Sequence, residues 1–196
     1  MSDPTPPFGP SEVEDRSRAK SRDSAAAAPS KAQSIRAYGL GVALFVFILD
    51  QVSKYVVTVP LQLQERRLIE LLPIFDLNWT QNRGVSMGYL NADTELMRWL
   101  LVALTGAIAL FVGVWMWREK RRDDVIGLGL VLGGAVGNIL DRVRFGYVVD
   151  FLDLHFGEIR PFLVFNVADA AITIGVLLLL VRALLMRDKG GSRKES

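Results

Sequence analysis

The sequence predicts a mainly α-helical integral membrane protein, with four transmembrane helices, a small β-sheet (a β-cradle) outside the membrane and both termini in the cytoplasm. Hydrophobic residues make up 51% of the 196 residues, and the mean hydropathy is +0.28. These residues gather in four runs that approach the roughly 20 residues needed to cross a bilayer. Lys and Arg concentrate in alternate connections between the runs, which orients the chain. These features distinguish the chain from an ordinary soluble domain.

The four apolar runs are the expected membrane spans. They cover residues 38–59, 96–117, 125–142 and 162–181. The third span is crowded with glycines, namely Gly127, Gly129, Gly133, Gly134 and Gly137. The glycines resemble a dinucleotide-binding run, but no strand precedes them and the segment is apolar. We therefore expect them to allow close packing against a neighbouring helix.

Basic residues indicate which segments face the cytoplasm. Six Lys or Arg residues precede the first span, four link the second to the third, and five follow the fourth. The other two connections hold few basic residues for their length. The positive-inside rule places the first three segments in the cytoplasm. The formal net charge of +2 is too small to indicate a nucleic-acid partner.

Composition divides the chain into a membrane domain and two tails. Residues 1–36 are rich in Pro, Ser, Ala and charge, which predicts a disordered cytoplasmic tail. The membrane domain is expected at residues 37–186. A second cytoplasmic tail is expected at residues 187–196, where Lys, Gly and Ser predominate.

Two exterior segments interrupt the membrane domain, at about residues 60–95 and 143–161. Residues 61–64 alternate between apolar and polar, residues 74–80 do so imperfectly, and both patterns are typical of strands. Residues 147–152 could add a further strand. We expect a small sheet on the membrane surface.

The chain has no cysteine and one histidine. The missing thiols exclude disulfides, thiolate catalysis and cysteine metal sites. One histidine is too few for a histidine-based metal centre. We therefore expect no metal and no cofactor.

Two aspartates lie in apolar sequence with no cation beside them in the chain. Asp150 ends an apolar run, and Asp169 lies near the start of the fourth span. An ionisable group at membrane depth is costly and marks a function by default. Two that converge can share one proton, an arrangement that activates water for peptide hydrolysis.

Topology brings further polar residues to the same membrane level. Spans one and three run outward and span four runs inward, with Asp169 expected roughly 10 Å deep. The residues that reach this level are Asp50, Lys54, Asn138, Asp141, Arg142 and Asn166, with Asn82, Gly84 and Asp150 at the surface. A random distribution of polar residues along the chain would not favour such convergence, so the convergence predicts a functional site.

Simpler explanations remain open for some of these residues. Asp50 and Lys54 are spaced i,i+4 and could merely neutralise each other. Asp141 and Arg142 could be ordinary interfacial charges. Asp169 is harder to dismiss, because no basic residue lies within a turn or two of it.

Other classes of function remain alternatives. The segment from Gly84 to Gly88 matches the Gly-x-Ser-x-Gly pattern of serine hydrolases, with Ser86 as nucleophile and His155 as base. No matching strand order surrounds it. A proton-relay protein or small transporter would need polar residues throughout the membrane, yet the inner halves of three spans are almost purely apolar. A scaffold without a site would leave Asp169 unexplained.

Five motifs in order resemble the lipoprotein signal peptidase family, also called signal peptidase II. They are Asp50-Gln51-Val52-Ser53-Lys54, Asn82-Arg83-Gly84-Val85-Ser86-Met87-Gly88, the stretch from Gly133 to Arg142, Val148-Val149-Asp150-Phe151 and Phe165-Asn166-Val167-Ala168-Asp169. The resemblance covers about residues 38–181. Met87 stands where the family more often has phenylalanine, which exchanges one bulky apolar residue for another.

The resemblance implies an intramembrane aspartyl endopeptidase that acts at the outer face of the bacterial inner membrane. It would remove signal peptides from prolipoproteins, cutting before a diacylglyceryl cysteine, as a monomer in contact with membrane lipid. Asp150 and Asp169 would be the catalytic pair. The supporting or substrate-binding residues would be Asp50, Lys54, Asn82, Gly84, Asn138, Asp141, Arg142 and Asn166.

Overall fold

The computed structural model describes residues 31–84, 95–157 and 159–191. The described residues from Ile35 onward form one compact unit, which contains all of the candidate site.

Four helices in the described residues are long and apolar enough to cross a membrane. They are α2 (Lys31–Thr58), α4 (Glu95–Arg118), α5 (Arg122–Phe145) and α6 (Val167–Gly191). The predicted spans are thus confirmed as helices, with different ends. Helix α2 begins at Lys31, so residues 31–36, assigned above to a disordered tail, are helical.

The predicted start of the fourth span was wrong. Helix α6 begins at Val167 rather than at residue 162, because Asn166 caps it: the Asn166 Oδ1 accepts the backbone N–H of Asp169 at 2.9 Å. Asp169 therefore lies in the first turn, nearer the helix end than expected. Residues 187–191, assigned above to a tail, continue the helix.

Glycines let α5 approach both α2 and α6. A Cβ on Gly129 would lie 2.8 Å from the Gly39 carbonyl oxygen of α2. A Cβ on Gly134 would lie 2.5 Å from the Ala168 carbonyl oxygen of α6. Both distances are too short for a side chain, so the glycines are required for this packing, as the sequence predicted.

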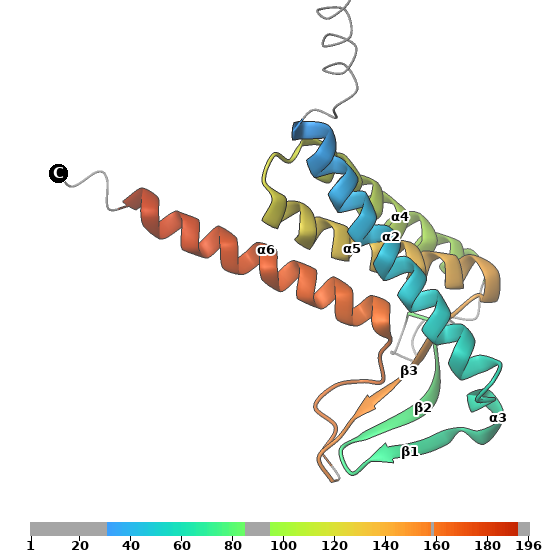
Figure 1. The fold of residues 1–196 in the computed structure, drawn as a ribbon. Helices are drawn as coiled ribbons and strands as arrows, with labels where there is room; N and C mark the ends of the chain where they lie inside the picture. The colour runs from blue at the N-terminus through green and yellow to red at the C-terminus, as the bar shows by residue number, and fades with distance from the viewer. Residues whose placement is uncertain (1–30, 85–94, 158, 192–196) are drawn as a thin grey trace, which may run out of the picture. The chain divides into compact units, whose positions relative to one another are not determined.

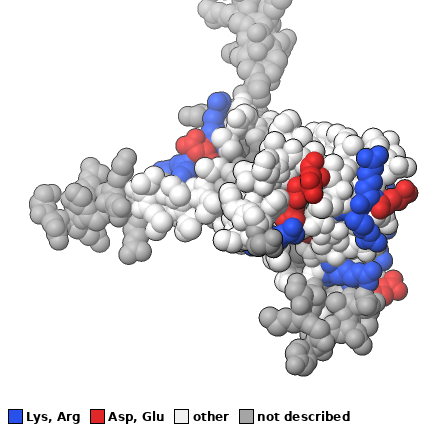
Figure 2. Space-filling view, turned by 90° about the horizontal axis from the view of Figure 1, so that it is seen from below, with Lys and Arg blue, Asp and Glu red and all other residues white. Residues whose placement is uncertain are grey.

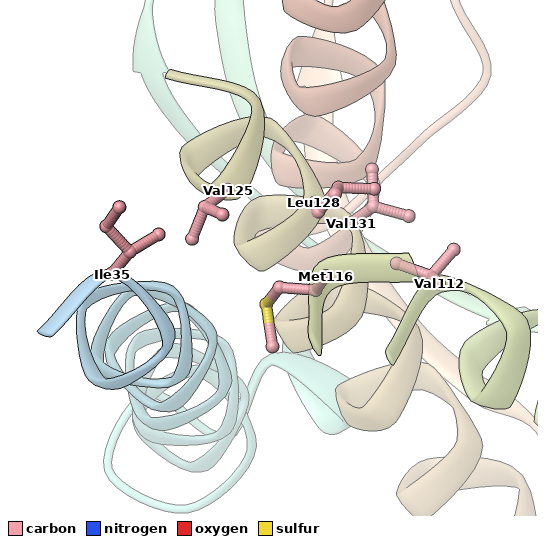
Figure 3. Close-up of a cluster of buried hydrophobic side chains, with 6 residues drawn as sticks. All are labelled: Ile35, Val112, Met116, Val125, Leu128 and Val131. Carbon is pink, nitrogen blue, oxygen red and sulfur yellow. The ribbon is translucent and has the colours of Figure 1, made fainter. Parts of the chain in front are cut away.

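Apolar side chains hold α2, α4 and α5 together at the ends opposite the sheet. Met116 of α4 is almost fully buried against Ile35 of α2 and Val125 of α5, and Figure 3 shows the three side chains converging. The rest of the cluster is Val112, Leu128 and Val131.

A three-stranded antiparallel sheet lies where α2 and α5 end and α6 begins (Figure 1). Its strands are β1 (Leu68–Leu72), β2 (Phe75–Asn82) and β3 (Val148–Leu154), in that order. Thr80 pairs with Asp150 across β2 and β3. The predicted small sheet is therefore confirmed, and β1 is a strand that the alternation did not reveal.

The predicted strand at residues 61–64 was wrong. Residues Leu63–Arg66 form the one-turn helix α3, entered through Gln62 in the left-handed region at φ 49°. Leu63 is fully buried with Val57 of α2 and Trp79 of β2. The chain must reverse between α2 and β1, and this anchored turn achieves it.

Charged side chains are sparse on the face seen from the sheet side. Figure 2 shows a surface made mostly of uncharged residues, with Lys and Arg at its right side, near its centre and at its upper left, each beside acidic residues.

Gly134→Ala should lower the free energy of unfolding by about 1 to 3 kcal/mol, because the added Cβ forces α5 away from α6. Gly113→Ala on α4 is the control, since no described atom lies within 4 Å of a Cβ placed there. That variant should be neutral or stabilising by up to about 1 kcal/mol. Thermal unfolding in detergent measures both, and equal effects would contradict the packing.

Candidate active site

Asp150 is held at the centre of the sheet edge nearest the helices. It lies on β3 opposite Thr80 and is only 1% exposed. Its Oδ1 accepts a hydrogen bond from Asn166 Nδ2 at 2.6 Å. The Asn82 side chain on β2 also hydrogen-bonds Asp150.

Asp169 occupies the first turn of α6 and is partly exposed. Its backbone N–H is capped by Asn166, and its Oδ1 accepts a hydrogen bond from Asn138 Nδ2 of α5 at 2.8 Å. The N-terminal end of a helix favours a negative charge. Asp169 is thus held by α5 and by the cap of α6 at the N-terminal end of the helix.

Two carboxamides connect the aspartates. Asn166 Nδ2 donates to Asp150 and also to Asn138 Oδ1, at 3.2 Å. Asn138 in turn donates to Asp169. A continuous chain of hydrogen bonds therefore runs from one carboxylate to the other.

The two carboxylates differ in their affinity for protons. Burial raises the pKa of Asp150 to about 7, and the nearby Asp169 carboxylate acts in the same direction. Hydrogen bonds from Asn82 and Asn166 and the charge of Lys54 oppose this rise. A pair so arranged can hold one proton near neutral pH.

Arg142 supplies a positive charge beside the pair. Its guanidinium interacts most with Asp169, then with Asp150 and Asp141. Its Nε is buried without a hydrogen-bond partner in the described part of the chain. The cation offsets part of the negative charge gathered around the two aspartates.

A second pair of carboxylates lies behind the first. Lys54 Nζ is 2.9 Å from Asp50 Oδ2 and 2.8 Å from Asp141 Oδ2, and it also donates to Asn138 Oδ1 at 3.2 Å. All four side chains are buried. Buried charges of this kind need partners, and here each has at least one.

Asn82 and Gly84 form the turn that follows β2. Asn82 Oδ1 accepts the Gly84 N–H at 2.9 Å, which leaves the amide nitrogen to donate to Asp150. Gly84 has a φ of 83°, a conformation that glycine adopts without strain. The turn therefore directs Asn82 into the site.

The structure brings together the predicted site residues. Asp50, Lys54, Asn82, Asn138, Asp141, Arg142, Asp150, Asn166 and Asp169 are linked by hydrogen bonds, ion pairs or close charges, and Gly84 joins through Asn82. Their catalytic and supporting roles stay predictions. The simpler explanation of Asp50 and Lys54 as an isolated pair is incomplete, because Lys54 also contacts Asp141.

Gln51 belongs to the same network, and the sequence did not single it out. Its Nε2 lies 3.1 Å from Asp50 Oδ2 and 3.1 Å from Asp141 Oδ1. Adjacent residues on a helix normally point apart. Its place within the first motif was the available signal.

The serine alternative depends on residues that the structure covers only in part. Ser86 lies outside the described residues. His155 Nε2 is 3.0 Å from Asp76 Oδ2, at the end of β3 away from Asp150. Among the described side chains, no group of three or more His, Asp and Glu could hold a metal ion.

Comparison with known proteins gives one consistent family. A family model described as signal peptidase (SPase) II matches residues 42–185. The chain is 60% identical over 153 residues to a lipoprotein signal peptidase of Rhizorhabdus wittichii, covering 78% of this chain and 89% of the relative. It is 57% identical over 154 residues to a lipoprotein signal peptidase of Sphingopyxis alaskensis, covering 79% and 89%.

The fold is also similar to that of a bacterial membrane enzyme solved by the in meso method at 2.3 Å resolution. The TM-score is 0.64 at 27% identity, and the match covers 81% of this chain and 93% of the other.

As the pH rises, the free energy of unfolding of the Asp150→Asn variant should increase relative to that of the wild type. A carboxyl whose folded-state pKa is raised above 3.8 contributes stability at low pH and loses it as the pH rises towards about 7. Asparagine does not titrate, so the variant does not lose stability in this way as the pH rises. Between pH 5 and pH 8 the difference in unfolding free energy should shift by about 2 to 3 kcal/mol in favour of the variant.

Thermal unfolding in detergent across this pH range measures the shift. Glu65→Gln is the control, because Glu65 is exposed on α3 and its effect should change little with pH. A pH-independent difference for Asp150→Asn would contradict the raised pKa.

Proposed function

This chain belongs to the signal peptidase II family of aspartic peptidases, which remove signal peptides from prolipoproteins, and on that premise we propose that Asp150 and Asp169 are its catalytic pair. The observation that carries the proposal is the hydrogen-bonded chain from Asp150 through Asn166 and Asn138 to Asp169. It holds two carboxylates at one place where they share a proton. Membership of an aspartic peptidase family excludes the serine hydrolase, transporter and scaffold alternatives.

Asp169 acts as the base and Asp150 as the acid. Asp169 is partly exposed at the N-terminus of α6, so water can reach its carboxylate. It takes a proton from the water that attacks the scissile carbonyl carbon. Asp150, buried with a pKa near 7, donates a hydrogen bond and then its proton to the carbonyl oxygen.

Arg142 and the carboxamides stabilise this arrangement. The Arg142 charge lies near both aspartates and offsets the negative charge that develops on the carbonyl oxygen. Asn166 and Asn138 orient the two carboxylates through the hydrogen bonds that they donate. When the C–N bond of the tetrahedral intermediate breaks, Asp169 gives its proton to the leaving amine and Asp150 takes a proton from a hydroxyl of the intermediate, which restores the starting state of the pair.

The active site faces the outside of the bacterial inner membrane. Basic residues lie at the opposite helix ends, as Arg36 on α2, Arg118 on α4 and Arg182 on α6 illustrate, and they support a cytoplasmic location for those ends. Asp169 then lies at the outer interface. Water reaches it there, while the acyl chains of a substrate stay in the bilayer.

The substrate is a prolipoprotein whose cysteine carries diacylglycerol, cut on the amino side of that cysteine. The enzyme works as a monomer in contact with membrane lipid. Its catalytic domain is residues 37–186, and the family match at residues 42–185 supports these limits. The helices extend slightly beyond these limits, since residues 31–36 belong to α2 and residues 187–191 to α6.

Asp150→Asn and Asp169→Asn should each lower cleavage by about 10²- to 10⁴-fold, because each removes one partner of the proton transfer. The assay follows loss of the signal peptide from a diacylglyceryl-modified prolipoprotein, with the enzyme reconstituted in lipid. Asp123→Asn is the matched control, since the Asp123 side chain is 75% exposed on α5. Cleavage near the wild-type rate by either active-site variant would refute the dyad.

Asn82→Ala should move the basic limb of the pH–rate profile to higher pH. The hydrogen bond from Asn82 favours the ionised form of Asp150, so its loss raises the pKa of Asp150 further. The wild-type rate should fall above about pH 7. A basic limb that does not move would show that Asp150 is not the proton donor.

A further inference from the structure

The residue just before each proposed catalytic aspartate donates its backbone N–H to a buried carboxylate, and the two carboxylates differ. The Ala168 N–H, one residue before Asp169, donates to Asp50 Oδ1 at 3.0 Å. The Val149 N–H, one residue before Asp150, donates to Asp141 Oδ2 at 3.2 Å. The separation between Asp50 and Asp141 is therefore transmitted to the separation between Asp169 and Asp150.

The carboxylates of Asp50 and Asp141 repel each other, and one ammonium group lies between them. Lys54 Nζ contacts the Oδ2 atoms of both, at 2.9 and 2.8 Å. Two negative charges and one positive charge leave this buried group with a net negative charge. The ammonium group of Lys54 therefore does not by itself balance the two carboxylates, although the Arg142 charge also acts on Asp141.

Gln51 also bridges Asp50 and Asp141, through its side-chain amide. Its Nε2 donates to Asp50 Oδ2 and to Asp141 Oδ1, at 3.1 Å each, and lies 3.4 Å from the Gly137 carbonyl oxygen. Among the described residues, the side chains of Lys54 and Gln51 are those with bonds to both carboxylates. An uncharged donor adds this bridge without adding a charge.

We infer that Gln51 is a positioning residue that, with Lys54, sets the distance between Asp150 and Asp169. The inference rests on the proposed function, because it assigns those aspartates as the pair to be positioned. Among the described residues, the side chain of Gln51 hydrogen-bonds Asp50, Asp141 and the Gly137 carbonyl oxygen, so it acts on the pair through Asp50, Asp141 and two backbone amides. Loss of its donor lets the two supporting carboxylates separate, and the dyad opens with them.

The space around Gln51 permits a clean substitution. Gln51 lines a cavity of about 530 Å³ together with Lys54, Tyr55 and Trp79. The methionine side chain is similar in length to that of glutamine but has no hydrogen-bond donor, and the cavity leaves room for its slightly different conformation. Gln64 lines the same cavity on α3 and is exposed, so Gln64→Met is a matched control outside the network.

Gln51→Met should lower kcat by about 10- to 100-fold, the effect expected of a displacement near 1 Å at the reacting groups. KM should change little, because the inference places Gln51 away from the substrate. Gln51→Glu should lower kcat further, because it keeps the shape but cannot donate and adds a third negative charge. Gln64→Met should match wild type in both constants.

The pH–rate profile separates positioning from loss of folded enzyme. Two carboxylates that move apart interact less, so the acidic and basic limbs of kcat/KM should move towards each other in Gln51→Met. A smaller active fraction lowers the whole profile without moving either limb. The charged groups around Gln51 are Asp50 and Lys54 on α2, Asp141, Arg142 and Arg144 on α5, Asp150 on β3 and Asp169 on α6, and the substitution by Met leaves all of them in place.

Two results would overturn the inference. One is wild-type kcat in Gln51→Met. The other is evidence of a packing role. A drop in the kcat of Gln51→Met without movement of the limbs of the pH–rate profile would be such evidence, and so would a Gln51→Glu variant that is more active than Gln51→Met. If Gln51→Met does not fold, the near-isosteric Gln51→Glu still tests donation, with wild-type kcat as the contrary outcome. These results leave the dyad intact as long as Asp150→Asn and Asp169→Asn are inactive, so the two proposals fail separately.

Discussion

The ammonium group of Lys54 lies between two buried carboxylates, and the geometry of the site depends on that interaction. Asp50 is fully buried and Asp141 is 1% exposed. Neither could remain charged there without a partner, because a buried unpaired ion costs several kcal/mol. Both carboxylates also accept backbone N–H groups: Asp141 accepts that of Val149, just before Asp150 on β3, and Asp50 accepts that of Ala168, at the start of α6. The charge balance of α2 and α5 thereby fixes the positions of residues on two other elements.

The same constraint explains why two identical side chains behave differently. Asp150 is enclosed by the sheet and the helix ends, whereas Asp169 stands at the open end of α6. Burial favours the protonated form of the first, whereas the second is partly open to water. This difference in environment, rather than the residue type, supports the proposed division into acid and base.

Much of the fold could be predicted from the sequence, because each membrane span is a long run of apolar residues. The convergence of Asp50, Asn138 and Asp169 followed from topology and helical rise alone. Local chain reversals could not be predicted in this way: α3 forms because Leu63 is buried by residues distant in sequence, and the start of α6 depends on a cap by Asn166. Gln51 was missed because its contacts depend on how α2 packs against α5.

The hydrogen bond between Asp50 and the Ala168 N–H joins residues 118 positions apart. Its two partners lie on the first and the last of the four long helices, so it cannot form during synthesis until the last helix has left the ribosome and entered the membrane. The proposed dyad likewise needs Asp169 of that last helix. Activity by the proposed mechanism can therefore begin only after synthesis has passed the fourth long helix, and not while the chain is still incomplete.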